Sequence, residues 1–227
     1  MFRRVLIVTL SILFSFANFA GEPAGYNSER QPDYPIFSGN NDGSMFSLTK
    51  IGTFGFSRGG DVLGEVTTLF ENGDVRVYEM KAGGLAHIYG GVLLESNAFP
   101  IGIQATFGYN GDYEGASNGA LNWRRFPIEA LLVTRLSRFK FGAGLYYALS
   151  PKFSSPDGSI PFKNALGYTV QIGVFQDHHN AAFTVKYTRV NYDILLTPAE
   201  EALLESQGLA LLPVNGDSVG IFAEMHF

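Results

Sequence analysis

The sequence predicts an all-β chain that closes into a transmembrane, antiparallel, up-and-down β-barrel of eight strands with long extracellular loops. Three observations predict this class. Apolar residues recur at every second position in several long segments, short and long connections alternate along the chain, and the N-terminus has the layout of a secretory signal. The alternating segments run to about ten residues, which a tilted membrane strand requires, whereas strands of soluble sandwiches average about five or six.

The first twenty residues are expected to be a cleaved signal peptide. Arg3 and Arg4 precede the apolar run Val5–Phe16, and the small residue Ala20 stands just before Gly21. The alternative is a retained anchor, but the run is shorter than the ~20 residues of a spanning helix and no basic stop-transfer cluster follows it. The sequence therefore predicts export from the cytoplasm.

Beyond the signal, the chain divides into a leader and a barrel. Residues 21–44 are rich in Gly, Pro, Asn, Asp and Ser, which predicts a flexible periplasmic leader. Period-two alternation then extends over residues 45–227 with no uninterrupted apolar stretch of helical-span length. Because only helices and closed barrels satisfy every backbone polar group in lipid, membrane insertion of this region requires a closed barrel.

Eight segments are expected to form the barrel strands. The clearest alternate strictly between apolar residues and Gly, Gln, Thr or Lys, and three weaker ones show the same period. In chain order the eight are Leu48–Ser57, Leu85–Glu95, Ile101–Asn110, Asn122–Leu136, Phe139–Leu149, Leu166–Phe175, Ala181–Tyr192 and Val219–Phe227.

The connections between these segments separate the two ends of the barrel. Three are short and four are long, and they alternate as periplasmic turns and extracellular loops do in outer-membrane barrels. Both chain ends are then periplasmic. The short ones are Ser96–Phe99, Ser137–Arg138 and Asp177–Asn180, and the long ones are Arg58–Gly84, Gly111–Leu121, Pro151–Asn164 and Asp193–Asp217.

The first long connection leaves the strand count open between eight and ten. Val62–Leu69 and Val75–Met80 flank Asn72-Gly73, a strong hairpin signal, and they could be two further barrel strands. The second of them is short, and Arg76 and Glu79 place charges on both of its faces. An extracellular hairpin is therefore the preferred interpretation, with ten barrel strands as the alternative.

The last long connection, Asp193–Asp217, contains a convincing helix signal. Thr197-Pro-Ala-Glu200 combines an N-cap, a proline at the first helical position and a capping-box glutamate, and Gly208 is a natural terminator. The connection is also rich in leucine. We expect either a lid that packs on the barrel rim or a contact surface for a partner or lipid.

Composition, charge and missing motifs argue against several kinds of site and function. The chain has no cysteine, so disulfides, thiolate metal sites and cysteine nucleophiles are ruled out. Its formal charge is −5 and no basic stripe is present, which argues against nucleic-acid binding. Nucleophile-elbow, phosphate-loop and paired metal-ligand motifs are absent. We therefore expect no enzyme, no cofactor, and no catalytic, cofactor-binding or metal site.

An eight-stranded barrel has an interior just wide enough for side chains to fill. Strand phase places nine long or polar side chains inside, namely His87, Gln104, Arg125, Glu129, Tyr146, Gln171, Lys186, Glu224 and His226. Buried charges need partners, so Arg125 and Lys186 are expected to pair with Glu129 and Glu224. This pattern indicates a polar plug; a gated proton or ion path is the alternative.

Several motifs resemble small outer-membrane β-barrel proteins, the group that includes opacity proteins and the barrel domain of outer-membrane protein A. They are Ala116-Ser-Asn-Gly119, Arg125-Phe-Pro-Ile-Glu129, Phe141-Gly-Ala-Gly-Leu-Tyr146, Ser150-Pro-Lys152 and Tyr187-Thr-Arg-Val-Asn-Tyr192. The terminal Phe227 is similar to the signal that the barrel-assembly machinery reads. The resemblance covers nearly all of the chain after the leader, and it implies fold and location but no agreed activity.

The expected function is that of an integral, porin-like barrel in the outer membrane of a Gram-negative cell. It would act as a structural or cell-surface interaction protein through its extracellular loops, with outer-membrane lipid and an extracellular ligand or surface partner as contacts. One alternative is a narrow channel or conduit for small solutes. The other is a lipid-modifying enzyme, in which His87 would need to meet a serine or carboxylate; the adjacent His178 and His179 are a weak metal signal.

Overall fold

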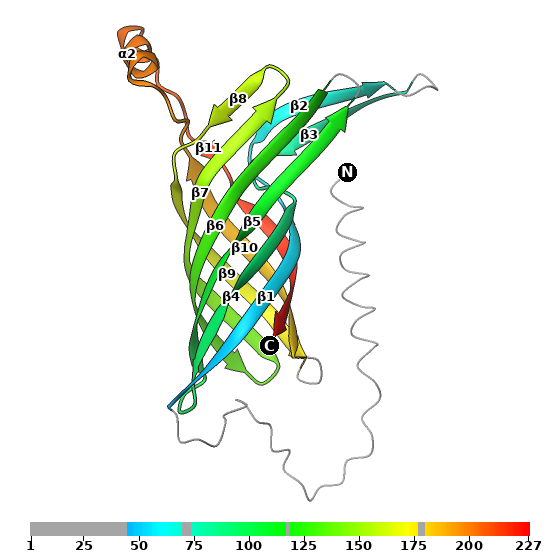
Figure 1. Cartoon of the computed structure of the whole chain (residues 1–227), viewed down its shortest axis with the longest axis vertical. Coiled ribbons are helices and arrows are strands. Elements are labelled where there is room, and N and C mark those ends of the chain that lie inside the picture. The colour runs from blue at the N-terminus through cyan, green and yellow to red at the C-terminus, as the bar shows by residue number, and fades with distance from the viewer. Residues whose placement is uncertain (1–44, 70–73, 117–118, 177–179) are drawn as a thin grey trace, which may run out of the picture. The chain divides into compact units, whose positions relative to one another are not determined.

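The computed structural model describes residues 45–69, 74–116, 119–176 and 180–227. The expectations for the signal peptide, the leader, Asn72-Gly73 and His178-His179 concern residues outside these ranges. The described chain forms a closed antiparallel barrel of eight strands, as the alternation predicts (Figure 1). The strands are β1 (Phe46–Arg58), β4 (Ala86–Ser96), β5 (Ile101–Ala116), β6 (Gly119–Leu136), β7 (Phe139–Ser155), β9 (Ala165–Gln176), β10 (Ala181–Tyr192) and β12 (Ser218–His226).

Every barrel strand pairs with its neighbour in chain order, and the ring is closed between its first and last strands. β1 pairs with β12 from Ile51–His226 to Arg58–Val219, and with β4 on its other side. Closure removes the free strand edges of the barrel. The result is the up-and-down topology that the alternating connections predict.

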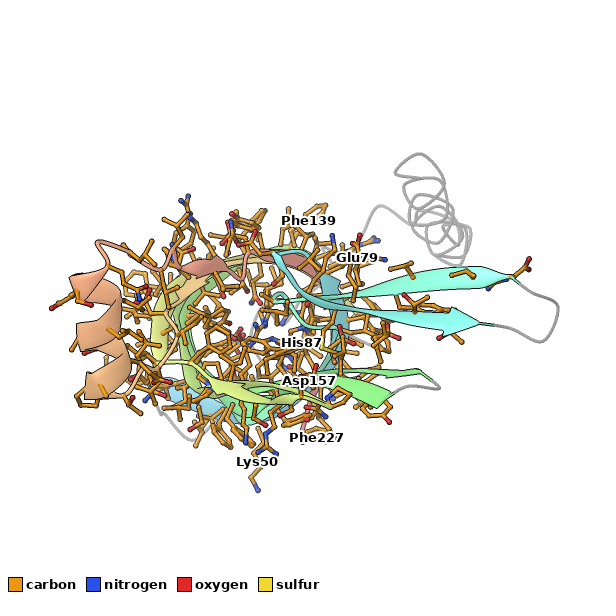
Figure 2. All side chains as sticks on the ribbon, turned by 90° about the horizontal axis from the view of Figure 1, so that it is seen from above. Lys50, Glu79, His87, Phe139, Asp157 and Phe227 are labelled. Carbon is orange, nitrogen blue, oxygen red and sulfur yellow. The ribbon has the colours of Figure 1, made fainter. Side chains whose placement is uncertain are left out.

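Side chains alternate across the barrel wall as the strand period requires. On β9, for example, Leu166 and Ile172 are 66% and 49% exposed on the outside, whereas Thr169 and Gln171 are buried inside. Figure 2 looks along the barrel and shows His87 within the ring of strands, with Phe139 and Lys50 outside it. The outer wall is therefore predominantly apolar, and the interior carries polar and charged groups.

The two ends of the barrel differ sharply. Two of the three short turns, residues 97–100 and 137–138, lie at one end, which we call the turn end; Ser137 accommodates the tight turn with φ of 55°. The opposite end, the loop end, carries β2 (Val62–Leu69), β3 (Val75–Lys81), β8 (Gly158–Pro161), β11 (Val214–Asn215) and the helix α2 (Pro198–Ser206) (Figure 1).

The structure decides between eight and ten barrel strands. β2 and β3 pair only with each other, in a two-stranded sheet separate from the barrel, so the ten-strand alternative is wrong. Two other long loops expected from the sequence are shorter in the structure, because the strands beside them extend further. β5 and β6 continue past the barrel as a paired extension to Ala116 and Gly119, and β7 pairs with β8 beyond Lys152.

The helix α2 forms where its capping signals predict it. Thr197 accepts a hydrogen bond from the Glu200 backbone N–H, and the Glu200 carboxylate accepts from the Thr197 N–H, both in the expected capping box. The bonds from the Thr197 backbone and hydroxyl lower the pKa of Glu200. No residue of α2 is buried, so the expected lid on the rim is wrong for the helix itself. No helix in the described part of the chain is both long and apolar enough to cross a membrane.

Candidate functional site

An ion pair bridges the lumen between β6 and β10, which are separated by two other strands in the shorter direction around the ring. Lys186 Nζ lies 2.8 Å from Glu129 Oε2, and both side chains are almost fully buried. Thr106 on β5 donates its hydroxyl proton to the same carboxylate oxygen at 3.2 Å. The bridge is the one that strand phase suggested between Lys186 and a carboxylate, and it ties opposite walls together.

A second bridge runs between β7 and β12, again skipping two strands. Lys140 Nζ donates to Glu224 Oε1 and, at 2.8 Å, to Gln104 Oε1. Gln104 Nε2 in turn donates to Glu224 Oε2 at 3.1 Å, and His226 Nε2 lies 2.7 Å from Glu224 Oε1. Side chains from three strands, β5, β7 and β12, thus meet at one carboxylate. Because charge-assisted hydrogen bonds are strong in a water-poor interior, this cluster braces the lumen.

The sequence predicts that Lys186 pairs with one of two carboxylates, Glu129 or Glu224; the partner is Glu129, and the other expected pairings are wrong. Glu224 pairs with Lys140, a residue omitted from the inward set even though it shares the phase of Gly142, Gly144 and Tyr146. Strand phase alone could have found Lys140. Arg125 was expected to bind a carboxylate and instead binds backbone.

Arg125 sits in a cage of carbonyl oxygens and aromatic rings. Its Nη1 and Nη2 donate to the carbonyls of Ala82 and Gly83, at 2.5 and 2.7 Å. Its guanidinium carbon lies 5.5–5.9 Å from the ring centres of Trp123, Tyr146 and Tyr192. Both contacts favour a buried cation, because carbonyl oxygens and ring faces present partial negative charge. Arg125 therefore fastens the segment after β3 to the inside of the barrel.

One face of the β2–β3 hairpin packs on an apolar cluster at the loop end. Val66 of β2 and Met80 of β3 are buried, and Ala82 follows them into the same apolar cluster. This cluster is aromatic-rich, with T-shaped contacts of Trp123 to Phe162 and Tyr192. Its other members are Leu121, Tyr146, Ala148, Phe153, Ala165 and Val190. The hairpin expected from sequence thus forms, and it projects to one side of the ring of barrel strands (Figure 2).

A smaller apolar cluster occupies the interior nearer the turn end. It consists of Ile51, Leu93, Leu131 and Val133, all buried. Leu93 and Leu131 flank Gln104 in the sheet, so this aliphatic cluster lies beside the Lys140–Glu224 bridge, while the aromatic cluster lies at the loop end. Side chains of the described residues thus fill this part of the lumen, as the expected polar plug requires.

His87 does meet a serine, which sequence spacing could not show. Ser57 Oγ lies 2.5 Å from His87 Nε2, and Asn110 Nδ2 lies 2.7 Å from His87 Nδ1. Ser57 Oγ is also 3.2 and 3.3 Å from the carbonyl oxygens of Gly83 and Gly84. These contacts hold the segment after β3 against β1 and β4.

Gly84 is required at this fastening point. Its φ is +72°, and a Cβ atom there would lie 2.1 Å from Asn110 Oδ1. The backbone can therefore enter the lumen only without a side chain at this position.

Within the described ranges, no group of three or more His, Asp or Glu side chains is placed to hold a metal ion. Comparisons with known proteins add no assignment: no protein-family model and no curated protein matches the chain.

Proposed function

We propose that this chain is an integral outer-membrane β-barrel that serves as a structural and surface-interaction protein, with the elements at the loop end as its working surface. The observation that carries the proposal is the pair of ion bridges, Lys186–Glu129 and Lys140–Glu224, which cross the lumen between non-adjacent strands. A lumen filled by its own side chains supports anchoring better than transport.

The outer wall supports lipid as the environment of the barrel. Outward side chains such as Ile103, Leu132, Leu145 and Leu166 are 57–66% exposed and apolar. Soluble monomers rarely expose a continuous apolar surface that surrounds the molecule. Outer-membrane lipid is the partner that would cover it, and the terminal Phe227 is the element that we propose the barrel-assembly machinery recognises.

The absence of native cysteine allows a direct test of location and orientation. Single cysteines are placed at exposed loop-end positions, Asp157→Cys and Glu205→Cys, and at an exposed turn-end position, Arg138→Cys. Intact Gram-negative cells that express each variant are treated with a membrane-impermeant maleimide. We expect labelling of both loop-end cysteines in intact cells, and of the Arg138→Cys protein only after lysis.

The same samples provide the contradicting outcomes. Recovery of the protein in the soluble fraction would overturn membrane integration. Labelling of the Arg138→Cys protein in intact cells would overturn the orientation, whether or not the loop-end cysteines are labelled.

A further inference from the structure

The connection between β10 and β12 has an unusual composition for an exposed segment. Residues 193–217 contain seven leucines, five acidic residues and no lysine or arginine. Its leucines are not hidden in the fold: Leu195, Leu203, Leu209, Leu211 and Leu212 are 49–85% exposed. Large apolar side chains gathered on one exposed segment indicate a contact surface.

Part of this surface is a groove of about 370 Å³. Its apolar wall is formed by six side chains: Ile194, Leu196, Leu204, Leu209, Leu211 and Leu212. Its polar margin carries Lys163, Asp193, Glu201 and Glu205. A groove lined by both apolar and charged side chains fits an amphipathic chain better than a fully apolar ligand.

Both ends of the connection, near Asp193 and near Asn215, are hydrogen-bonded to neighbouring segments. We therefore treat the groove as preformed. The Lys163 N–H donates to the Asp193 carbonyl at 2.8 Å, and the Leu195 N–H donates to the Pro161 carbonyl at 2.9 Å. On the return limb, the Asp61 N–H donates to the Asn215 carbonyl at 2.7 Å. A preformed site loses less conformational entropy on binding than a disordered loop does.

The net charge of the groove favours some ligands over others. Lys163 is 3.7 Å from Glu201, and within the described residues no cation lies within 4 Å of Glu205. The polar margin therefore has an excess of negative charge. Helices that lie on membrane surfaces carry Lys and Arg on their polar face, whereas α2 has glutamates and no basic residue. Charge complementarity thus favours a basic occupant over an anionic lipid surface.

We propose that this groove is the docking site for a basic, amphipathic polypeptide segment of a partner protein. The leucine side chains would receive its apolar face, and Glu201, Glu205 and Asp193 would receive its lysine or arginine side chains. The inference rests on the proposed surface-interaction function and specifies the kind of partner that the loop end accepts.

The test uses the purified full barrel in nanodiscs of zwitterionic phosphatidylcholine and three fluorescent peptides of equal length. One is an amphipathic leucine–lysine peptide, one is its leucine–glutamate counterpart, and one is a scrambled leucine–lysine peptide without an apolar face. We expect saturable binding of the basic amphipathic peptide alone, measured by fluorescence anisotropy against empty nanodiscs.

Two groove variants and two matched controls locate the binding. Leu212→Ser and Glu205→Lys should each raise the Kd of the basic peptide about tenfold or more, which corresponds to the loss of one anchoring contact. Glu65→Lys makes the same change, and Val75→Ser a similar apolar-to-serine change, at exposed positions on the β2–β3 hairpin; both should leave the Kd unchanged. All four sites are exposed, so the fold is retained, and the heat-dependent gel shift of each variant checks this.

Three outcomes overturn the proposal. They are equal binding of the basic peptide to empty nanodiscs, equal binding of the acidic or scrambled peptide, and an unchanged Kd in both groove variants. Because the assay uses purified protein, it is independent of cellular location. Failure here with correct cysteine labelling in cells would remove the basic partner and leave the proposed function intact.

Discussion

Replacing Lys186 with alanine should destabilise the barrel by about 3–5 kcal/mol, because the change leaves the Glu129 carboxylate buried without its cation. The double variant Lys186→Ala/Glu129→Ala removes both charges and should recover part of this loss. The unfolding free energy can be measured in urea with Trp123, the single tryptophan, as an intrinsic fluorescence probe, since this side chain is fully buried in the folded barrel.

The neighbouring ion pair supplies the control. Lys186→Ala combined with Glu224→Ala should show no recovery, because Glu224 is bound by Lys140 rather than by Lys186. If this combination recovered stability and the Glu129 combination did not, the charge pairing across the lumen would be different from the one described.

Replacing Ile103 with arginine should cost about 2–4 kcal/mol in a lipid bilayer if the position lies near the midplane, because the guanidinium would face hydrocarbon. Ile103 is 57% exposed on the outer wall, and it lies opposite Leu132 and Leu94 on the flanking strands. The measurement is urea unfolding of the protein reconstituted in liposomes.

Asp157→Arg is the matched control for this substitution, since it introduces the same side chain at an exposed loop-end turn. It should change the unfolding free energy little. Equal costs at Ile103 and Asp157 would show that the wall at Ile103 does not face lipid.

The strands of the barrel were predictable because a period of two residues assigns every position to one wall face. Ile103 and Ile172 were placed outside, and Gln104, Glu129 and Lys186 inside, from phase alone, and the structure confirms these faces. The helix was predictable for a different reason, because Thr197 and Glu200 form a local capping box that needs no tertiary context.

The partners inside the lumen were not predictable, because they depend on how strands are staggered around the ring. Lys186 and Glu129 are 57 residues apart, and Lys140 and Glu224 are 84 apart. Strand phase says that such side chains point inward, but it does not say at which height they meet. Glu224 was consequently matched with the wrong cations.

The contacts that hold the segment after β3 inside the barrel were missed for a further physical reason. Arg125 binds the backbone carbonyls of Ala82 and Gly83, and a carbonyl acceptor has no signature in the sequence. The contact of Ser57 with His87 likewise arises only when β1 and β4 pair, because the two residues are 30 positions apart. The one local signal in the sequence was Gly84. Its positive φ and its lack of a side chain allow the segment after β3 to enter the lumen.

Single-channel recording in planar lipid bilayers tests the central claim, a lumen closed by its own side chains, most directly. The Lys186–Glu129 and Lys140–Glu224 bridges and the aromatic cluster at the loop end fill the lumen with side chains. We therefore predict that the reconstituted monomer is silent or shows only rare, small openings. Large and steady conductance from the monomer would show an open pore and would contradict the account.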